Sequence, residues 1–193
     1  MTGYPATLSI RDARGRYFAA NGFGEGGYEA RWVRLQAGPV AIWFPNTAAR
    51  VRAVRLHDVH HVVTEYDTTW TGEAEIGAWE IASGCADHHA AWLLNLLAMA
   101  IGLALAPRRL CAAFVRGRAS GNLYRSTVDE ALLASTVGAV RTRLRLDGPP
   151  HTARSGDRAL FAFWSVLAIA TLLATVGVTL APLVLAAYLL GAV

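Results

Sequence analysis

The carboxyl-terminal end of the chain carries the feature that most restricts its fold, a long run without a charged residue. The run covers residues 159–193, thirty-five positions that are almost all apolar. A single helix of that length would be about 52 Å long, against a hydrocarbon layer of about 30 Å. Gly177 and Pro182 offer a place for a break. We therefore expect a membrane helix over about 159–175, then a second apolar helix that returns or lies in the bilayer.

Charges flank only the start of this run. Arg154 and Arg158 lie there, and residues 147–157 (DGPPHTARSGD) have the composition of a linker. The positive-inside rule then places the preceding domain on the cytoplasmic side, as in a protein of the bacterial inner membrane. Residues 1–45 contain no apolar run suited to a signal peptide. The predicted organisation is a domain over 1–147, a linker over 148–158 and a membrane anchor over 159–193.

Composition excludes several other classes of protein. The hydrophobic content of 54% is high for a wholly soluble chain. The formal charge of +4 comes from arginines that are spread along the chain, without any lysine, so we expect no nucleic-acid partner. Two cysteines, Cys85 and Cys111, form neither a disulfide framework nor a CxxC motif, which fits a reducing compartment.

Periodicity predicts a mainly α-helical domain with one small β-hairpin near the amino terminus. The hairpin is expected over about 30–45, where an alternating segment, a Gly38-Pro39 turn and a β-prone segment follow one another. An isolated hairpin is not stable, so we expect its aromatic side chains, Trp32, Trp43 and Phe44, to pack on the helices. Helices are expected over 9–20, 47–64, 71–84, 87–107 and 127–146, with Thr71 and Asp87 as caps and a basic turn over 116–122.

One short stretch concentrates the residue types that bind metals. It reads His57-Asp58-Val59-His60-His61, and eleven residues separate His61 from Glu73. On a helix, the side chains at 57, 58 and 61 project from one side and that at 60 projects from another. Glu73 lies in the first turn of the next helix, and a tight turn would return it to this side, with Gly77 allowing the two helices to approach. We predict a divalent metal ion bound by His57, Asp58, His61 and Glu73, with zinc first and iron or manganese as alternatives.

Glu80 is the candidate catalytic residue. It lies seven residues after Glu73, on the same helix face but about 10 Å further along, too far to bind the same ion. It can orient a metal ligand or act as a general base. The alternative is a plain ion pair with one of the arginines.

The motif resembles the signature of the Coq4 family of ubiquinone-biosynthesis proteins. The sequence around it, including HVVT at 61–64, Gly72-Glu73, Trp79-Glu80 and Gly84, is also similar, as are 115–124 and 141–144, so that the resemblance covers about 50–147. It implies an all-helical domain with a divalent metal that acts at a membrane on prenylated ring precursors. The implied reaction replaces the ring carboxyl at C1 by decarboxylation and hydroxylation, and other biosynthetic proteins are implied partners. Glu65 stands where the family commonly has glycine.

Two other functions remain open. The first is a non-catalytic, membrane-anchored lipid-binding scaffold for a biosynthetic complex, in which the metal only fixes the fold; an oligomer is compatible with either function. The second is a membrane di-iron hydroxylase, because the histidines at 57–61 and His88-His89 look like its histidine boxes. Such enzymes use about eight histidines, and this chain has six. An open coordination position would indicate chemistry, and a closed four-ligand site would indicate a structural role.

Overall fold

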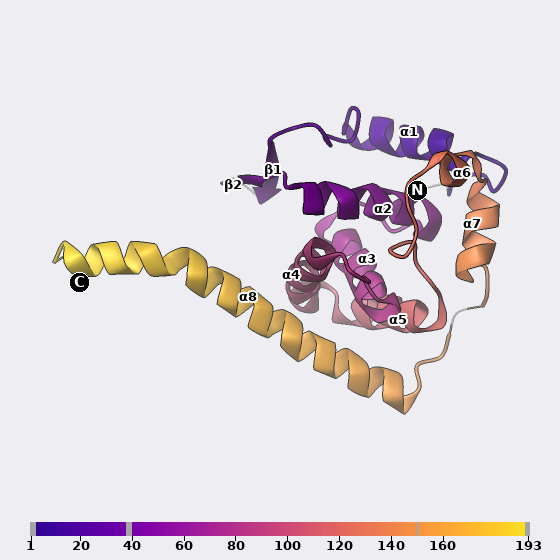
Figure 1. The fold of residues 1–193 in the computed structure, drawn as a ribbon. Coiled ribbons are helices and arrows are strands. Elements are labelled where there is room, and N and C mark those ends of the chain that lie inside the picture. The colour runs from indigo at the N-terminus through magenta and orange to yellow at the C-terminus, as the bar shows by residue number, and fades with distance from the viewer. Residues whose placement is uncertain (1–2, 38–39, 150, 192–193) are drawn as a thin grey trace.

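The structure is a computed structural model that describes residues 3–37, 40–149 and 151–191 (Figure 1). It confirms a mainly helical chain with a small amino-terminal hairpin and an apolar carboxyl-terminal helix. The elements in chain order are α1 (Ile10–Asn21), β1 (Trp32–Ala37), β2 (Val40–Pro45), α2 (Ala48–Thr64), α3 (Trp70–Ser83), α4 (His89–Leu105), α5 (Pro107–Ala119), α6 (Glu130–Ala134), α7 (Val137–Leu144) and α8 (Ser155–Leu189).

Helix α3 is the centre of the domain and packs most extensively against α5 and α4. Two glycines permit this. A Cβ atom on Gly117 of α5 would lie 2.4 Å from the carbonyl oxygen of Trp79, and one on Gly102 of α4 would lie 2.3 Å from the Cβ of Ala74. Gly77 faces the backbone of Asn95 in α4. The prediction that Gly77 brings the two motif helices together is therefore wrong, because its open side faces α4 and not α2.

Hydroxyl side chains begin the two helices that carry the motif. Thr47 caps α2 as predicted, whereas α3 is capped by Thr69 and not by Thr71. Helix α2 ends at Thr64, and the capping residue Glu65 has a φ of 65°, in the left-handed region that glycine favours. Asp87 does not cap α4; the capping position is His88, and Asp87 lies 3.5 Å from Arg52 in an ion pair.

The predicted helix over 127–146 is two short helices, α6 and α7. The amino-terminal segment takes the backbone groups at the break. The carbonyl of Ser135 accepts a hydrogen bond from the Ile10 N–H (2.8 Å), and the Val137 N–H donates to the Leu8 carbonyl (2.8 Å). The predicted basic turn over 116–122 is also wrong at its start, because α5 continues to Ala119 and Arg116 donates to the Thr64 carbonyl (3.0 Å).

The hairpin forms as predicted but does not pack as predicted. Its strands pair antiparallel from Trp32 opposite Pro45 to Ala37 opposite Val40, and the predicted turn at 38–39 lies outside the described residues. Trp32 and Trp43 are 56% and 59% exposed, so they do not anchor the hairpin on the helices. Arg34 within the hairpin covers the Trp43 ring instead. Phe44 is half-buried, with the Arg50 guanidinium of α2 over its ring.

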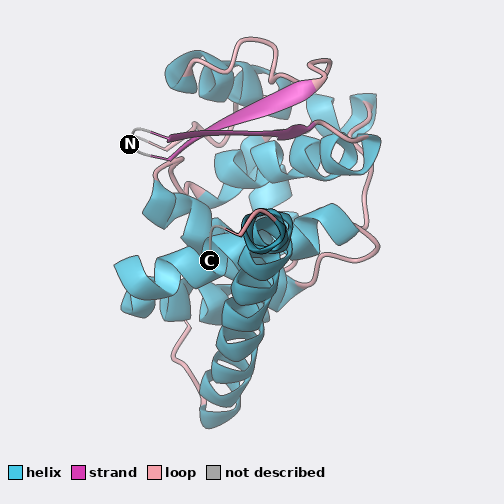
Figure 2. Ribbon diagram, turned by 90° about the vertical axis from the view of Figure 1, so that its left-hand side faces the viewer, coloured by secondary structure: helices cyan, strands magenta, loops and turns pink. Residues whose placement is uncertain are grey.

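The apolar tail forms one continuous helix, α8, and not two. Pro182 lies inside it without ending it, and the helix begins within the predicted linker. Its first half lies against α4 and α5: Trp164 stacks on Trp92 and Phe161 contacts Phe114, with ring centroids 5.3 and 5.5 Å apart. The second half projects away from the domain (Figures 1 and 2). By length and composition, α8 is the helix in the described part of the chain that could cross a membrane.

Candidate metal centre

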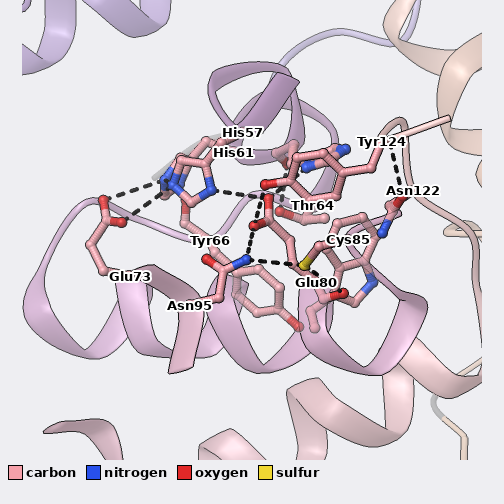
Figure 3. A network of polar contacts seen from close by, with 12 residues as sticks. His57, His61, Thr64, Tyr66, Glu73, Glu80, Cys85, Asn95, Asn122 and Tyr124 are labelled. Carbon is pink, nitrogen blue, oxygen red and sulfur yellow. Dashed lines mark hydrogen bonds and ion pairs between the residues drawn. The ribbon is translucent and has the colours of Figure 1, made fainter. Parts of the chain in front are cut away.

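Three side chains bring metal-binding atoms to a common point. His57 and His61 of α2 and Glu73 of α3 each offer one such atom, all within 4.8 Å of one another. The Nε2 atoms of the two histidines are 3.1 Å apart, and each lies 3.3–3.4 Å from an oxygen of Glu73. In Figure 3 Glu73 lies on one side of the paired imidazoles and Glu80 on the other. Three of the four predicted ligands thus converge.

Local structure explains the convergence. His57 and His61 are one helical turn apart, so they lie on the same side of α2. The loop after Glu65 is short, and α3 starts after the Thr69 cap, which places Glu73 in its first turn. The loop also supplies a contact of its own, because the Tyr66 carbonyl oxygen lies 2.9 Å from Nδ1 of His61.

The hydrogen bonds of the two imidazoles decide which ring nitrogens are free. Nδ1 of His61 faces the Tyr66 carbonyl, and Nδ1 of His57 lies 2.9 Å from Glu80 Oε1. Both partners accept only, so each Nδ1 carries a hydrogen and each Nε2 presents its lone pair to the shared point. Two lone pairs 3.1 Å apart beside a carboxylate need a cation between them, either a proton or a metal ion. This donor set fits a divalent metal that takes nitrogen and oxygen ligands.

Electrostatics at the centre favour charge separation. Burial opposes ionisation of Glu73, but the charges and hydrogen bonds of His61 and His57 hold its pKa below its usual range. Burial also acts to lower the pKa of His57, yet Glu80 and Glu73 raise it above the ordinary imidazole value. The centre is therefore a negative environment that favours a cation beside His57.

Glu80 is fully buried and has four hydrogen-bond partners. Its Oε1 accepts from Nδ1 of His57 (2.9 Å) and of His60 (2.6 Å), and its Oε2 accepts from Asn95 (2.5 Å) and Tyr124 (2.7 Å). Burial acts to raise the pKa of this carboxyl, but the two histidines hold it well below its usual value. The arrangement favours orientation of His57 over proton transfer. The prediction that Glu80 is catalytic stays a prediction.

Asp58 lies outside the group of converging donors. It is buried, and its Oδ2 accepts a hydrogen bond from the Tyr28 hydroxyl at 2.5 Å. Burial raises the pKa of this carboxyl, against the hydrogen bond from Tyr28. Its predicted role as the fourth ligand stays a prediction.

The remaining histidines have other partners. His60, as expected, points elsewhere: its Nε2 accepts from the Leu123 N–H at 2.9 Å. Nε2 of His88 lies 3.1 Å from the Tyr124 carbonyl oxygen. The di-iron hypothesis is therefore left with one donor cluster in the part of the chain that the structure describes.

The surroundings leave one side of the donor set open. The Glu73 side chain is 36% exposed, whereas His61 is buried beneath the stacked ring of Tyr17. A cavity of about 20 Å³ lies beside His61, lined by Tyr4, Tyr17, Asn21, His61, Glu65, Tyr66, Asp67 and Thr68. It has room for about one water molecule. Three protein donors with an exposed edge are compatible with an exchangeable coordination position.

Sequence reasoning missed the residues that support the centre. Tyr28, Asn95 and Tyr124 donate hydrogen bonds to Asp58 and Glu80 but come from a loop, from α4 and from the segment after α5. No spacing in the sequence links these three residues to the motif. Comparison of the chain with family models, with curated proteins and with solved structures finds no match.

Proposed function

We propose that the chain is a membrane-anchored, divalent-metal-dependent protein similar to the Coq4 family. It would act on the ring carboxyl of a prenylated precursor in the biosynthesis of ubiquinone or a related isoprenoid quinone. The observation that carries the proposal is the convergence of His57, His61 and Glu73 on one point. The motif resemblance supplies the reaction class, C1 decarboxylation or hydroxylation.

His57, His61 and Glu73 would hold the metal, zinc first and iron or manganese as alternatives, with Asp58 as the fourth candidate ligand. When bound, the metal would supply Lewis acidity toward a carboxyl or phenol oxygen of the ring. Glu80 fixes the ring of His57, and the Tyr66 carbonyl fixes that of His61. Such outer contacts usually set ligand orientation and affinity. The exposed edge of Glu73 is the side open to substrate.

Helix α8 would keep this centre at the bilayer, where a prenylated compound resides. Arg154 and Arg158 precede the apolar segment. These positive charges support a domain on the cytoplasmic side, in a bacterial inner membrane. Membrane lipid, the prenylated precursor and other biosynthetic proteins are the proposed partners.

One observation favours a second candidate, a non-catalytic lipid-binding scaffold in which the metal stabilises the fold. The cavity beside His61, of about 20 Å³, is too small for an aromatic ring. Catalysis would therefore require substrate to approach from the exposed side of Glu73. The scaffold needs no such approach.

Metal content and co-purified lipid test the proposal directly. The full chain in neutral detergent is compared with His57→Ala/His61→Ala, by elemental mass spectrometry and lipid mass spectrometry. The matched control is His89→Ala/His151→Ala, which removes two exposed histidines outside the centre. We expect near-stoichiometric metal in the wild type and the control, its loss in the first variant, and a co-purifying prenylated ring compound.

Two outcomes would change the assignment. A folded wild-type protein without metal would make the motif an ion-pair network. Stoichiometric metal without turnover or binding of a prenylated ring acid, together with unfolding of Glu73→Ala, would favour the scaffold.

A further inference from the structure

A large groove lies on the side of α2 away from the small cavity. It has a volume of about 830 Å³, and its walls are the segments on either side of the hairpin, the amino-terminal half of α2, and the chain after α5. Two phenols link it to the candidate metal centre. Tyr28 and Tyr124 both line the groove, and their hydroxyls donate to Asp58 and Glu80.

The groove is positively charged. Arg31, Arg52, Arg55 and Arg125 line it, against the carboxylates of Glu29 and Asp87. Asp87 pairs with Arg52, but Arg31, Arg55 and Arg125 form no ion pair within the described residues. All four arginines are exposed. Arg55 also lies over the Tyr28 ring, 5.0 Å from its centroid. Guanidinium groups that line one groove without carboxylate partners favour an anionic ligand with several oxygens, such as a phosphate.

The groove lies on the side of the domain from which α8 projects. Helix α2 begins beside the hairpin, and the views in Figures 1 and 2 place the hairpin on the same side as the free end of α8. The hairpin carries exposed Trp32, Ile42 and Trp43. Tryptophans gather at the membrane–water interface, where lipid phosphates also lie. A membrane that takes up the projecting half of α8 would therefore meet the hairpin and the groove.

We propose that this arginine groove binds the headgroup phosphate of an acidic phospholipid. Arg31, Arg55 and Arg125 contact the phosphate. The inference rests on the membrane anchoring in the proposed function and is independent of the metal.

The test is a calorimetric titration of the full chain in neutral detergent micelles. The probes are dioctanoyl phosphatidylglycerol, dioctanoyl phosphatidylcholine and inorganic phosphate. The groove variant is Arg31→Gln/Arg55→Gln/Arg125→Gln. The control, Arg16→Gln/Arg143→Gln/Arg145→Gln, removes the same charge at exposed arginines outside the groove. The groove variant and the control variant are also measured in the His57→Ala/His61→Ala background. Effects of losing the metal centre and of losing the groove are thereby measured separately.

We expect phosphatidylglycerol to bind more tightly than either other probe. The groove variant should weaken its binding roughly 100-fold, about fivefold for each arginine, and the control variant less than about threefold. Three results would overturn the proposal: equal weakening in both variants, no preference for phosphatidylglycerol over phosphatidylcholine, or inorganic phosphate bound as tightly as the lipid.

Discussion

At the scale of single residues, Glu80 shows how the core and the candidate site depend on each other. A carboxylate has about four acceptor positions, and Glu80 uses them for His57, His60, Asn95 and Tyr124. Because the donors come from α2, α4 and the segment after α5, one charge joins three parts of the domain. The same charge holds the hydrogen on Nδ1 of His57 and frees Nε2 for a metal.

Glu80→Gln is expected to destabilise the protein and weaken metal binding together. The new amide group places a donor against two existing donors, whichever way it is turned. We expect the free energy of unfolding to fall by about 3–5 kcal/mol and metal affinity to fall about 10–100-fold. Chemical denaturation in detergent and a competitive chelator titration measure the two effects.

Glu75→Gln is the matched control for this variant. Glu75 lies on the same helix, but its buried carboxylate pairs with the exposed guanidinium of Arg109 and contacts none of the histidines. Glu75→Gln should leave metal affinity unchanged and lower the free energy of unfolding much less than Glu80→Gln does. Equal effects of the two substitutions would show that the contacts of Glu80 do not orient the centre.

At the scale of elements, features fixed by neighbouring residues were predictable. The spacing of His57, His61 and Glu73 predicts their convergence because one helical turn and one short loop separate them. The cap at Thr47 and the end of α2 follow from the same local rules.

Features fixed by distant residues were not predictable. The break between α6 and α7 depends on hydrogen bonds from the segment around Leu8 and Ile10, far away in sequence. The stacking of Trp164 on Trp92 likewise joins the apolar tail to α4. Periodicity marks α4 and α8 as apolar, but it does not predict that the first half of α8 packs on the folded domain.

The close packing of α3 and α5 gives a second prediction at this scale. Gly117→Ala would place a methyl group 2.4 Å from the Trp79 carbonyl oxygen and 2.8 Å from the Cβ of Ala82, so the helices must separate. We expect a loss of about 1–3 kcal/mol in the free energy of unfolding. Gly15→Ala, on an exposed position of α1 with no atom within 4 Å, should instead add up to about 1 kcal/mol. Denaturant titration measures whether each variant gains or loses free energy of unfolding. A stabilised Gly117→Ala variant would contradict the close packing of α3 and α5.

At the scale of the whole molecule, α8 has two roles along its length. Up to Leu172 it is a component of the domain, with Ala168 fully buried and Phe161 and Trp164 packed on α5 and α4. From Leu173 to Leu189 it rises about 26 Å with mostly exposed side chains, close to the thickness of a bilayer. The docked half therefore fixes the direction in which the projecting half leaves the domain.

Two truncations separate these roles. A chain ending at Leu172 keeps the docked half, so we expect it to fold, to keep its metal content and to remain in the aqueous fraction when floated with phosphatidylcholine vesicles. The full chain should float with the vesicles. A chain ending at Arg154 also loses the partial burial of Phe161 and Trp164, each at less than the about 1.5–3 kcal/mol of a fully buried side chain. It should unfold at lower denaturant than the chain ending at Leu172. If the two truncated chains are equally stable, α8 does not dock; if the chain ending at Leu172 floats like the full chain, the projecting half is not the membrane anchor.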